Sequence, residues 1–104
     1  LQINQTEEPQ KSGLLPDALH HDVAHVLTLK GVQVHGFMAF GHPSMVPESC
    51  AAVFSAVSEH AKCLSALLGH EFSVLSLGMS QDYLPALQKG ATIIRVGRQL
   101  FIDE

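Results

Sequence analysis

Apolar residues along the chain fall into two patterns that alternate. Short, nearly continuous apolar runs indicate buried strands, while longer stretches with apolar residues three or four positions apart indicate helices. The expected strands span residues 1–4, 32–40, 72–79 and 91–97. The expected helices lie between them, at residues 14–31, 47–68 and 80–90. This order predicts an α/β protein with a parallel sheet, right-handed crossovers and strands covered on both faces.

Proline and glycine residues sharpen the expected helix ends. Pro47 and Gly69 bracket the longest helix as a first-turn residue and a left-handed C-terminal residue. The short third helix contains Pro85, so two starts stay open. A start at Ser80 sacrifices a backbone hydrogen bond, whereas a start at Asp82 places the proline in the first turn.

Two architectures fit this β-α-β-α-β-α-β order. One is a small open sheet of the doubly wound type, and the other is half of a (β/α)8 barrel, a fold of about 250 residues. Residues 1–104 contain no linker or repeat and are interpreted as one segment. A half-barrel leaves two sheet edges unpaired. That interpretation therefore implies a longer chain in cis or a second chain that supplies the missing strands.

Composition and charge argue against nucleic acid and membrane as partners. The 104 residues are 46% hydrophobic and 15% charged, with a formal net charge of −4, which argues against a nucleic-acid-binding protein. No apolar run is long enough to span a membrane. Cys50 and Cys63 lie 13 residues apart in one expected helix, roughly 20 Å, and cannot bridge each other. Reduced thiols of this kind are typical of a cytoplasmic protein.

The ends of the last two expected strands suggest an anion site. Gly78 and Gly97 allow close approach of the backbone, and ligands of parallel α/β folds bind at the carboxyl ends of strands. Ser80 offers a hydroxyl, and Arg95 or Arg98 a guanidinium suited to phosphate. The backbone amides expected to point into the same concavity are those of Met79, Ser80 and Arg98.

The same residues also have a purely structural interpretation. The two glycines then make tight turns, and Arg95 pairs with Asp82 or Asp103. Other candidate sites are weaker: His21 and His25 lie four residues apart but lack a third metal ligand, and Ser76 and Ser80 lack a neighbouring base. We therefore expect neither a metal site nor a catalytic triad. Among the histidines, His42 alone follows a strand at the functional edge.

Three motifs resemble one known family. The stretch "LSLGMSQDYLPALQKGATIIRVGRQLF" is similar to the closing signature of the pyridoxal-phosphate homeostasis proteins, S-x-G-M-S-x-D followed by G-x-T-x-[VI]-R-[IV]-G and F. "INQTEEPQKSG" resembles the family's V-N-x3-E-x2-K-x-G stretch, and "VQVHGFMAFG" resembles its R-G-L-M-x-I segment. The motifs occur in the family's order along essentially the whole chain.

The resemblance implies a fold and a function. The family's fold is a (β/α)8 barrel like the N-terminal domain of alanine racemase, and the match is to its carboxyl-terminal half, four strands of eight. Family members bind pyridoxal 5′-phosphate, have no established reaction, and are linked to vitamin B6 and amino-acid homeostasis. A partial racemase or decarboxylase barrel that uses pyridoxal phosphate is the alternative, as is a structural half-barrel without ligand.

The resemblance also implies which residues contact the cofactor. Met38 and Asn4 lie near the ring side of the pocket by that comparison. The phosphate is then held by residues of the closing signature, namely Gly78, Met79, Ser80, Arg95, Val96, Gly97 and Arg98. Arg98 stands where the family usually has a small residue. The family's Schiff-base lysine lies on an early strand, and this chain contains no counterpart of it.

Overall fold

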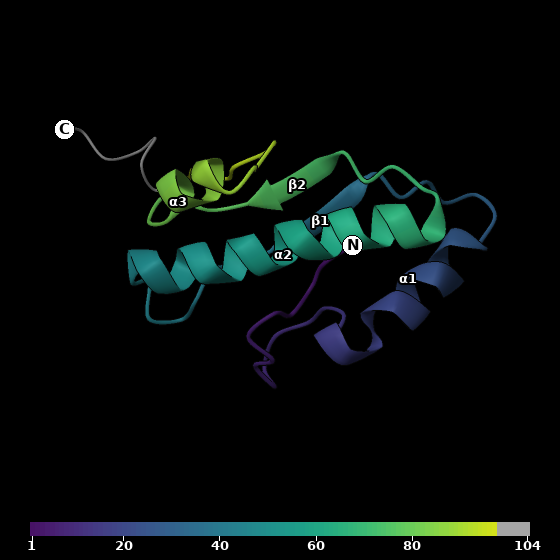
Figure 1. Ribbon diagram of the computed structural model, residues 1–104. Coiled ribbons are helices and arrows are strands. Elements are labelled where there is room, and N and C mark those ends of the chain that lie inside the picture. Colours follow the sequence, from purple (N-terminus) through teal and green to yellow (C-terminus); the bar gives the residue numbers. More distant parts are fainter. Residues whose placement is uncertain (98–104) are drawn as a thin grey trace.

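The computed structural model describes residues 1–97 (Figure 1). Two four-residue strands, three α-helices and one 3₁₀ turn make up its regular structure. In chain order they are η1 (Pro16–Ala18), α1 (Leu19–Leu27), β1 (Gly36–Ala39), α2 (Pro47–Leu68), β2 (Val74–Leu77) and α3 (Tyr83–Gln88). No helix in this part of the chain is both long and apolar enough to cross a bilayer.

The sheet is parallel, as predicted, but smaller than predicted. β1 pairs with β2 from Gly36 opposite Val74 to Ala39 opposite Leu77. The expected first and fourth strands, residues 1–4 and 91–97, are not strands among the described residues. They meet the sheet through single parallel bridges, Gln2 with Met38 and Ser76 with Ile93. The prediction of four full strands is therefore wrong for this structure, although the four segments lie side by side in chain order.

Local hydrogen bonding explains why the fourth segment does not form a regular ladder. The Thr92 hydroxyl accepts the amide of Leu75 at 2.8 Å. The Leu75 carbonyl in turn accepts both the Thr92 and the Ile93 amides, at 2.9 and 3.1 Å. A side chain thus occupies a position that a strand backbone needs, and regular pairing is confined to the central pair.

The longest helix forms as predicted. α2 begins at Pro47 and ends at Leu68, and Gly69 closes it in a left-handed conformation with φ 62°. Its inward stripe is fully apolar and consists of Val53, Phe54, Val57, Ala61 and Leu64, with Cys50 at its start. Burial of this stripe against the sheet supplies most of the helix's stability, since propensity alone rarely does so.

The other two helices are shorter than the sequence pattern suggests. Pro16 opens a 3₁₀ turn instead of an α-helix, and α1 ends at Leu27, so the extent of the first helix was overestimated. α3 is preceded by Asp82, which places Pro85 in its first turn. The structure thereby selects the later of the two starts, the one that costs no backbone hydrogen bond.

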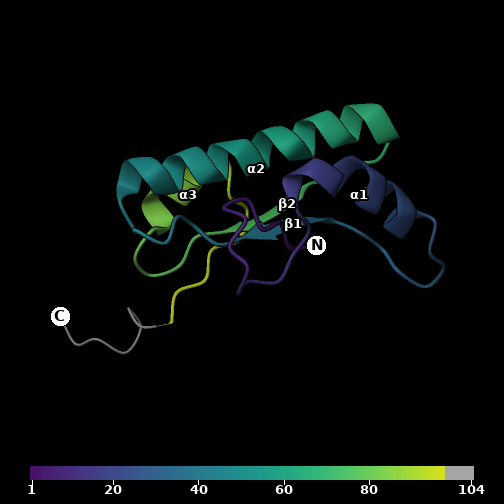
Figure 2. The ribbon, with the colours of Figure 1, turned by 90° about the horizontal axis from the view of Figure 1, so that it is seen from below.

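The helices cover one face of the sheet. Phe37, Ala39, Leu75 and Leu77 are buried in the same apolar cluster as the α2 stripe. Because side chains alternate along a strand, Met38 and Ser76 lie on the opposite face, and both are only half-buried. Figure 2 shows α1 and α2 together on one side of the strands. The expected covering of both faces is thus not found in residues 1–97.

Candidate functional site

The turn after β2 is closed by one aspartate. Gly78 has φ 87° and is buried. A methyl group there would lie 2.6 Å from the Cβ of Ala86 and 3.0 Å from the Cα of Tyr83, so glycine is required. Oδ1 of Asp82 accepts the amide of Met79 at 2.6 Å, and the Asp82 residue is 3% exposed. The Met79 amide, predicted to bind phosphate, is therefore already bonded to a carboxylate.

Ser80 lies next to a cavity between two helices. It lines a space of about 520 Å³ together with Pro47 and Glu48 at the start of α2 and Tyr83 and Leu84 of α3. Ser80 is half-buried, whereas the Met79 side chain is 44% exposed. Ser80, which the sequence singled out, thus lies at the carboxyl-terminal rim, two residues after Gly78.

Arg95 ties the last described segment to this turn. Its backbone amide donates to the carbonyl of Gly78 at 3.0 Å. Its guanidinium extends to the end of β1, where Nη2 donates to the carbonyl of Ala39 at 3.1 Å and Cζ lies 4.9 Å from the centre of the Phe40 ring. The residue therefore spans the carboxyl ends of both strands.

The guanidinium of Arg95 is incompletely satisfied within residues 1–97. Its Nε is buried and has no hydrogen-bond partner there. The ion pairs in this range join Lys11 to Glu8, His21 to Asp22 and Lys62 to Glu59, and none includes Arg95. The predicted alternative of a pair with Asp82 is not formed, and Asp103 lies outside the described residues. A half-buried cation without a carboxylate is suited to an anionic ligand.

The remaining residues of the closing motif differ in their surroundings. Val96 is half-buried and Gly97 is exposed. A methyl group on Gly97 would meet no atom of residues 1–97 within 4 Å, and the φ of Gly97 is not in the positive range. The described part of the fold therefore does not require glycine at this position. Arg98 lies outside the described residues, so its predicted contact stays a prediction.

Asn4, predicted to lie near the cofactor ring, organises its own loop. Its Nδ2 donates to the Glu8 carbonyl at 2.8 Å and to the Lys11 carbonyl at 3.4 Å, and its Oδ1 accepts the Glu8 amide at 3.1 Å. The side chain is buried, with its polar atoms engaged. Met38 lies in the middle of β1 and not at its end, opposite Gln2 and Ser76.

Charged side chains of the Asn4 loop approach the same rim. Lys11 Nζ lies 3.3 Å from Glu8 Oε2 and 4.8 Å from the centre of the Phe40 ring, so two cations contact one aromatic ring. A hydrogen bond from the Thr6 hydroxyl, assisted by Lys11, lowers the pKa of Glu8 below its usual value. This part of the rim carries a fixed, solvated pair of opposite charges.

His42, the histidine singled out for the functional edge, turns toward its own loop. Its Nδ1 accepts the amide of Ser44 at 3.1 Å. No group of three metal-binding side chains occurs in residues 1–97. Both cysteines are free, Cys50 buried and Cys63 exposed.

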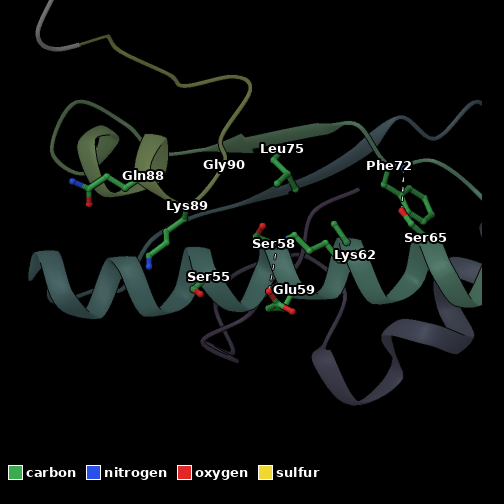
Figure 3. Close-up of a pocket in the computed structure, with 11 residues that line it drawn as sticks. Ser55, Ser58, Glu59, Lys62, Ser65, Phe72, Leu75, Gln88, Lys89 and Gly90 are labelled. Carbon is green, nitrogen blue, oxygen red and sulfur yellow. Dashed lines mark hydrogen bonds and ion pairs between the residues drawn. The ribbon is translucent and has the colours of Figure 1, made fainter.

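A further groove lies away from the rim (Figure 3). It has a volume of about 720 Å³ and runs between the serine-rich face of α2 and the segment that leads to Gly90. Ser55, Ser58 and Lys62 line one side, and Phe72 and Leu75 lie opposite. None of the predicted site residues lines this groove. One of its lysines, Lys62, is paired with Glu59.

Sequence reasoning missed Phe40 and misjudged Asp82. Phe40 is the first residue after β1 and contacts the Arg95 guanidinium. A signal existed, since an aromatic residue at the carboxyl end of a strand borders the ligand edge. Asp82 was considered as a helix cap or an arginine partner, whereas it bonds the Met79 amide three residues earlier.

Comparison with known proteins agrees with the motifs. No protein-family model matches the sequence. The chain is 39% identical over 94 residues to the pyridoxal phosphate homeostasis protein of Deinococcus radiodurans, covering 90% of this chain and 41% of that protein. It is 33% identical over 105 residues to the protein of the same name from Aquifex aeolicus, covering 97% and 44%.

The chain is homologous to the carboxyl-terminal part of the pyridoxal phosphate homeostasis proteins. It spans less than half the length of the curated relatives it matches. Solved structures of PipY from Synechococcus elongatus superpose well. Without pyridoxal phosphate the TM-score is 0.89 at 32% identity, over 98% of this chain and 48% of PipY. With pyridoxal phosphate bound it is 0.83 at 30% identity, over 96% and 47%.

Proposed function

We propose that this chain provides the phosphate-binding rim of a non-catalytic, pyridoxal 5′-phosphate-binding protein that acts in vitamin B6 and amino-acid homeostasis. The observation that carries the proposal is Arg95, which joins the two rim segments through its backbone while its guanidinium has no carboxylate partner within residues 1–97. The relatives are named as homeostasis proteins and not after a reaction, in line with a binding role.

Likeness to PipY supports the choice of ligand. One PipY structure contains pyridoxal phosphate, and this chain superposes on it over 96% of its own length. The chain spans only 47% of PipY. We therefore propose, by analogy, both the binding of pyridoxal phosphate and the homeostatic role. Pyridoxal phosphate carries an aldehyde that reacts with amines, and its phosphate is the group that this rim is suited to hold.

The described residues fit a phosphate. The buried Nε of Arg95 lacks an acceptor, and phosphate oxygens are strong acceptors. The backbone at Gly97 is open, since a methyl group there would meet no atom of residues 1–97 within 4 Å. Ser80 lies in the turn after β2, two residues beyond Gly78. We propose that Ser80, Arg95 and the backbone of Val96, Gly97 and Arg98 hold the phosphate.

Other predicted contacts take modified roles in this proposal. Met79 contributes its position in the turn, because its amide is bonded to Asp82. Asn4 shapes the loop beside the ring of the ligand, since its side chain is engaged with Glu8 and Lys11. Met38, on the face of β1 away from the helices, borders the ring.

The one-sided sheet supports a half-barrel. In a (β/α)8 barrel the helices lie outside and the other face of the sheet lines the interior, which is the arrangement of α1, α2 and the two strands in Figure 2. A doubly wound sheet would carry helices on both faces. We infer that the open face is completed by strands from a longer chain or from a second chain, which also provides the lysine that reacts with the cofactor aldehyde.

Calorimetric titration with pyridoxal phosphate tests the function. Arg95→Ala is expected to weaken binding by about 1.5–3 kcal/mol, the range for hydrogen bonds to charged groups. Arg95→Lys should recover only part of this, since it keeps the charge and loses the planar fork. Lys62→Ala, on the exposed side of α2, is the matched control and should bind like the wild type. Equal affinity of Arg95→Ala and wild type would remove Arg95 from the site.

A further inference from the structure

The turn after β2, which carries Gly78, Met79 and Ser80 and is called the phosphate turn below, contacts a buried carboxylate, that of Asp82. The inference drawn from it rests on the proposed function. Asp82 is 3% exposed, although aspartate is seldom fully buried without a partner. Its Oδ1 accepts the Met79 amide at 2.6 Å, a short, charge-assisted bond. No lysine or arginine in residues 1–97 forms an ion pair with it. Burying a carboxylate without a cation costs free energy, which indicates that Asp82 has a specific structural or functional role.

Asp82 does not act as a cap for its own helix. It precedes α3 at the N-cap position, yet its side chain makes no hydrogen bond to the first turn of that helix. The carboxylate points backward instead, to the amide of Met79 three residues earlier. Backbone bonds reinforce the same turn, because the Asp82 amide donates to the Met79 carbonyl at 3.2 Å. The side chain therefore stabilises the turn rather than the helix.

The carboxylate also packs against the loop after β1. A methyl group on Gly41 would collide with Oδ2 of Asp82, and it would lie 3.1 Å from Sγ of Cys50 and 3.2 Å from Cζ of Phe54. Burial, with the neighbouring Asp82 charge, raises the pKa of the Cys50 thiol. Asp82 thus lies between the turn after β2, the loop after β1 and the first turn of α2.

From Asp82 the contacts continue to the proposed phosphate ligands. Its carboxylate holds the Met79 amide, the preceding Gly78 carbonyl accepts the Arg95 amide at 3.0 Å, and the Arg95 guanidinium reaches the Ala39 carbonyl. A displacement of Asp82 would therefore move the turn that carries Ser80 and the backbone that carries Arg95. Neither effect requires contact between Asp82 and the ligand.

We propose that Asp82 is the positioning residue of the phosphate turn: an internal carboxylate that satisfies the Met79 amide and fixes the turn before the ligand arrives. The phosphate then meets a turn of set shape, which lowers the ordering cost of binding. Gly41 is also required for this arrangement, because only a residue without a side chain leaves room for Oδ2 of Asp82.

Four variants test the proposal: Asp82→Ala, Asp82→Asn, Gly41→Ala and the double variant Gly41→Ala/Asp82→Ala. Asp82→Ala should weaken binding of pyridoxal phosphate and of inorganic phosphate by tenfold or more. Asp82→Asn keeps an acceptor for the Met79 amide and should recover most of the affinity. Gly41→Ala should mimic Asp82→Ala, and the double variant should be no worse than Asp82→Ala alone. Asp17→Ala, at an exposed site in η1, is the control.

Amide hydrogen exchange gives a readout independent of ligand. The Met79 amide should be protected in the free wild-type chain and in Asp82→Asn, and should exchange at least tenfold faster in Asp82→Ala and Gly41→Ala. A rapidly exchanging Met79 amide in the wild type would overturn the proposal even if a variant fails to fold. So would wild-type phosphate affinity in a folded Asp82→Ala chain.

These outcomes separate the two proposals. Wild-type binding that survives Asp82→Ala overturns the positioning role alone. Failure of the wild-type chain to bind either compound overturns the proposed function and the positioning role with it. Loss of binding in Asp82→Ala with recovery in Asp82→Asn supports both.

Discussion

The two glycines of the carboxyl-terminal rim look alike in the sequence and differ in the structure. Gly78 is buried at φ 87°, and a methyl group there would press on Ala86 and Tyr83. Gly97 is exposed, its φ lies outside the positive range, and a methyl group on it would meet no atom of the described residues within 4 Å. Glycine is thus needed at Gly78 by the fold, whereas at Gly97 only a ligand that approaches the backbone would need it. The same residue type serves packing at one position and access at the other.

The largest expected effect is that of Gly78→Ala. Positive φ and the contact with Ala86 should together lower the free energy of unfolding by about 2–4 kcal/mol, as measured by urea denaturation. Gly69→Ala is the matched control, because Gly69 has φ 62° and open space around it. That control should lose about 1–2 kcal/mol from strain alone. Equal losses in both variants would contradict the claim that Gly78 is packed.

Phe40→Leu probes how the Arg95 guanidinium is held. Leucine keeps apolar bulk but removes the ring contacted by Arg95 and Lys11. We expect a loss of about 0.5–1 kcal/mol in the free energy of unfolding, the range for exposed cation–π contacts. A double-mutant cycle with Arg95→Ala should show coupling between the two residues. Full additivity would show that the ring does not position Arg95.

Gly97→Ala should separate access from packing. The free energy of unfolding should change by no more than about 0.5 kcal/mol, as at other open surface positions, since the new methyl group meets no atom of residues 1–97 within 4 Å. Affinity for pyridoxal phosphate should nevertheless fall severalfold, because the methyl group keeps the phosphate from the backbone. Calorimetry and thermal unfolding of one sample would measure both. Unchanged affinity would exclude the backbone of Gly97 from the site.

Alkaline pH should slightly lower the free energy of unfolding through ionisation of the buried Cys50 thiol. Burial raises the pKa of Cys50, so the folded state favours the neutral thiol. This contribution is fully present below the ordinary thiol pKa of about 8.5 and is lost as pH rises through the higher folded value. Unfolding curves at pH 7 to 10 should show the decline, and Cys50→Ala should reduce it. An equal decline in that variant would assign the effect to another group.

The sequence predicted most of the order of elements but not the extent of the sheet. α2 and its closing Gly69 follow from apolar spacing and from two terminal residues, and they agree with the structure. The outer strands were overestimated because local apolar pattern does not reveal that Thr92 bonds Leu75 through its side chain.

The sequence indicated which segments meet at the candidate site but not the bonding there. The closing motif singled out Gly78, Ser80 and Arg95, and the structure brings Gly78 and Arg95 together through a backbone hydrogen bond. That the Met79 amide is taken by Asp82, and that Asn4 bonds its own loop, depends on side-chain directions that sequence spacing leaves open. Phe40 was missed because its place at the carboxyl end of a strand indicates the ligand edge but does not reveal contact with a cation.

Amide NMR of the chain during a titration with pyridoxal phosphate tests the central claim most directly. Two rim segments that hold one phosphate should respond together: the amide signals of Ser80 and Gly97 should shift along a single binding curve, and inorganic phosphate should reproduce the shifts at higher concentration. Signals of Ser80 and Gly97 that stay unmoved, or that follow separate curves, would contradict a shared phosphate site.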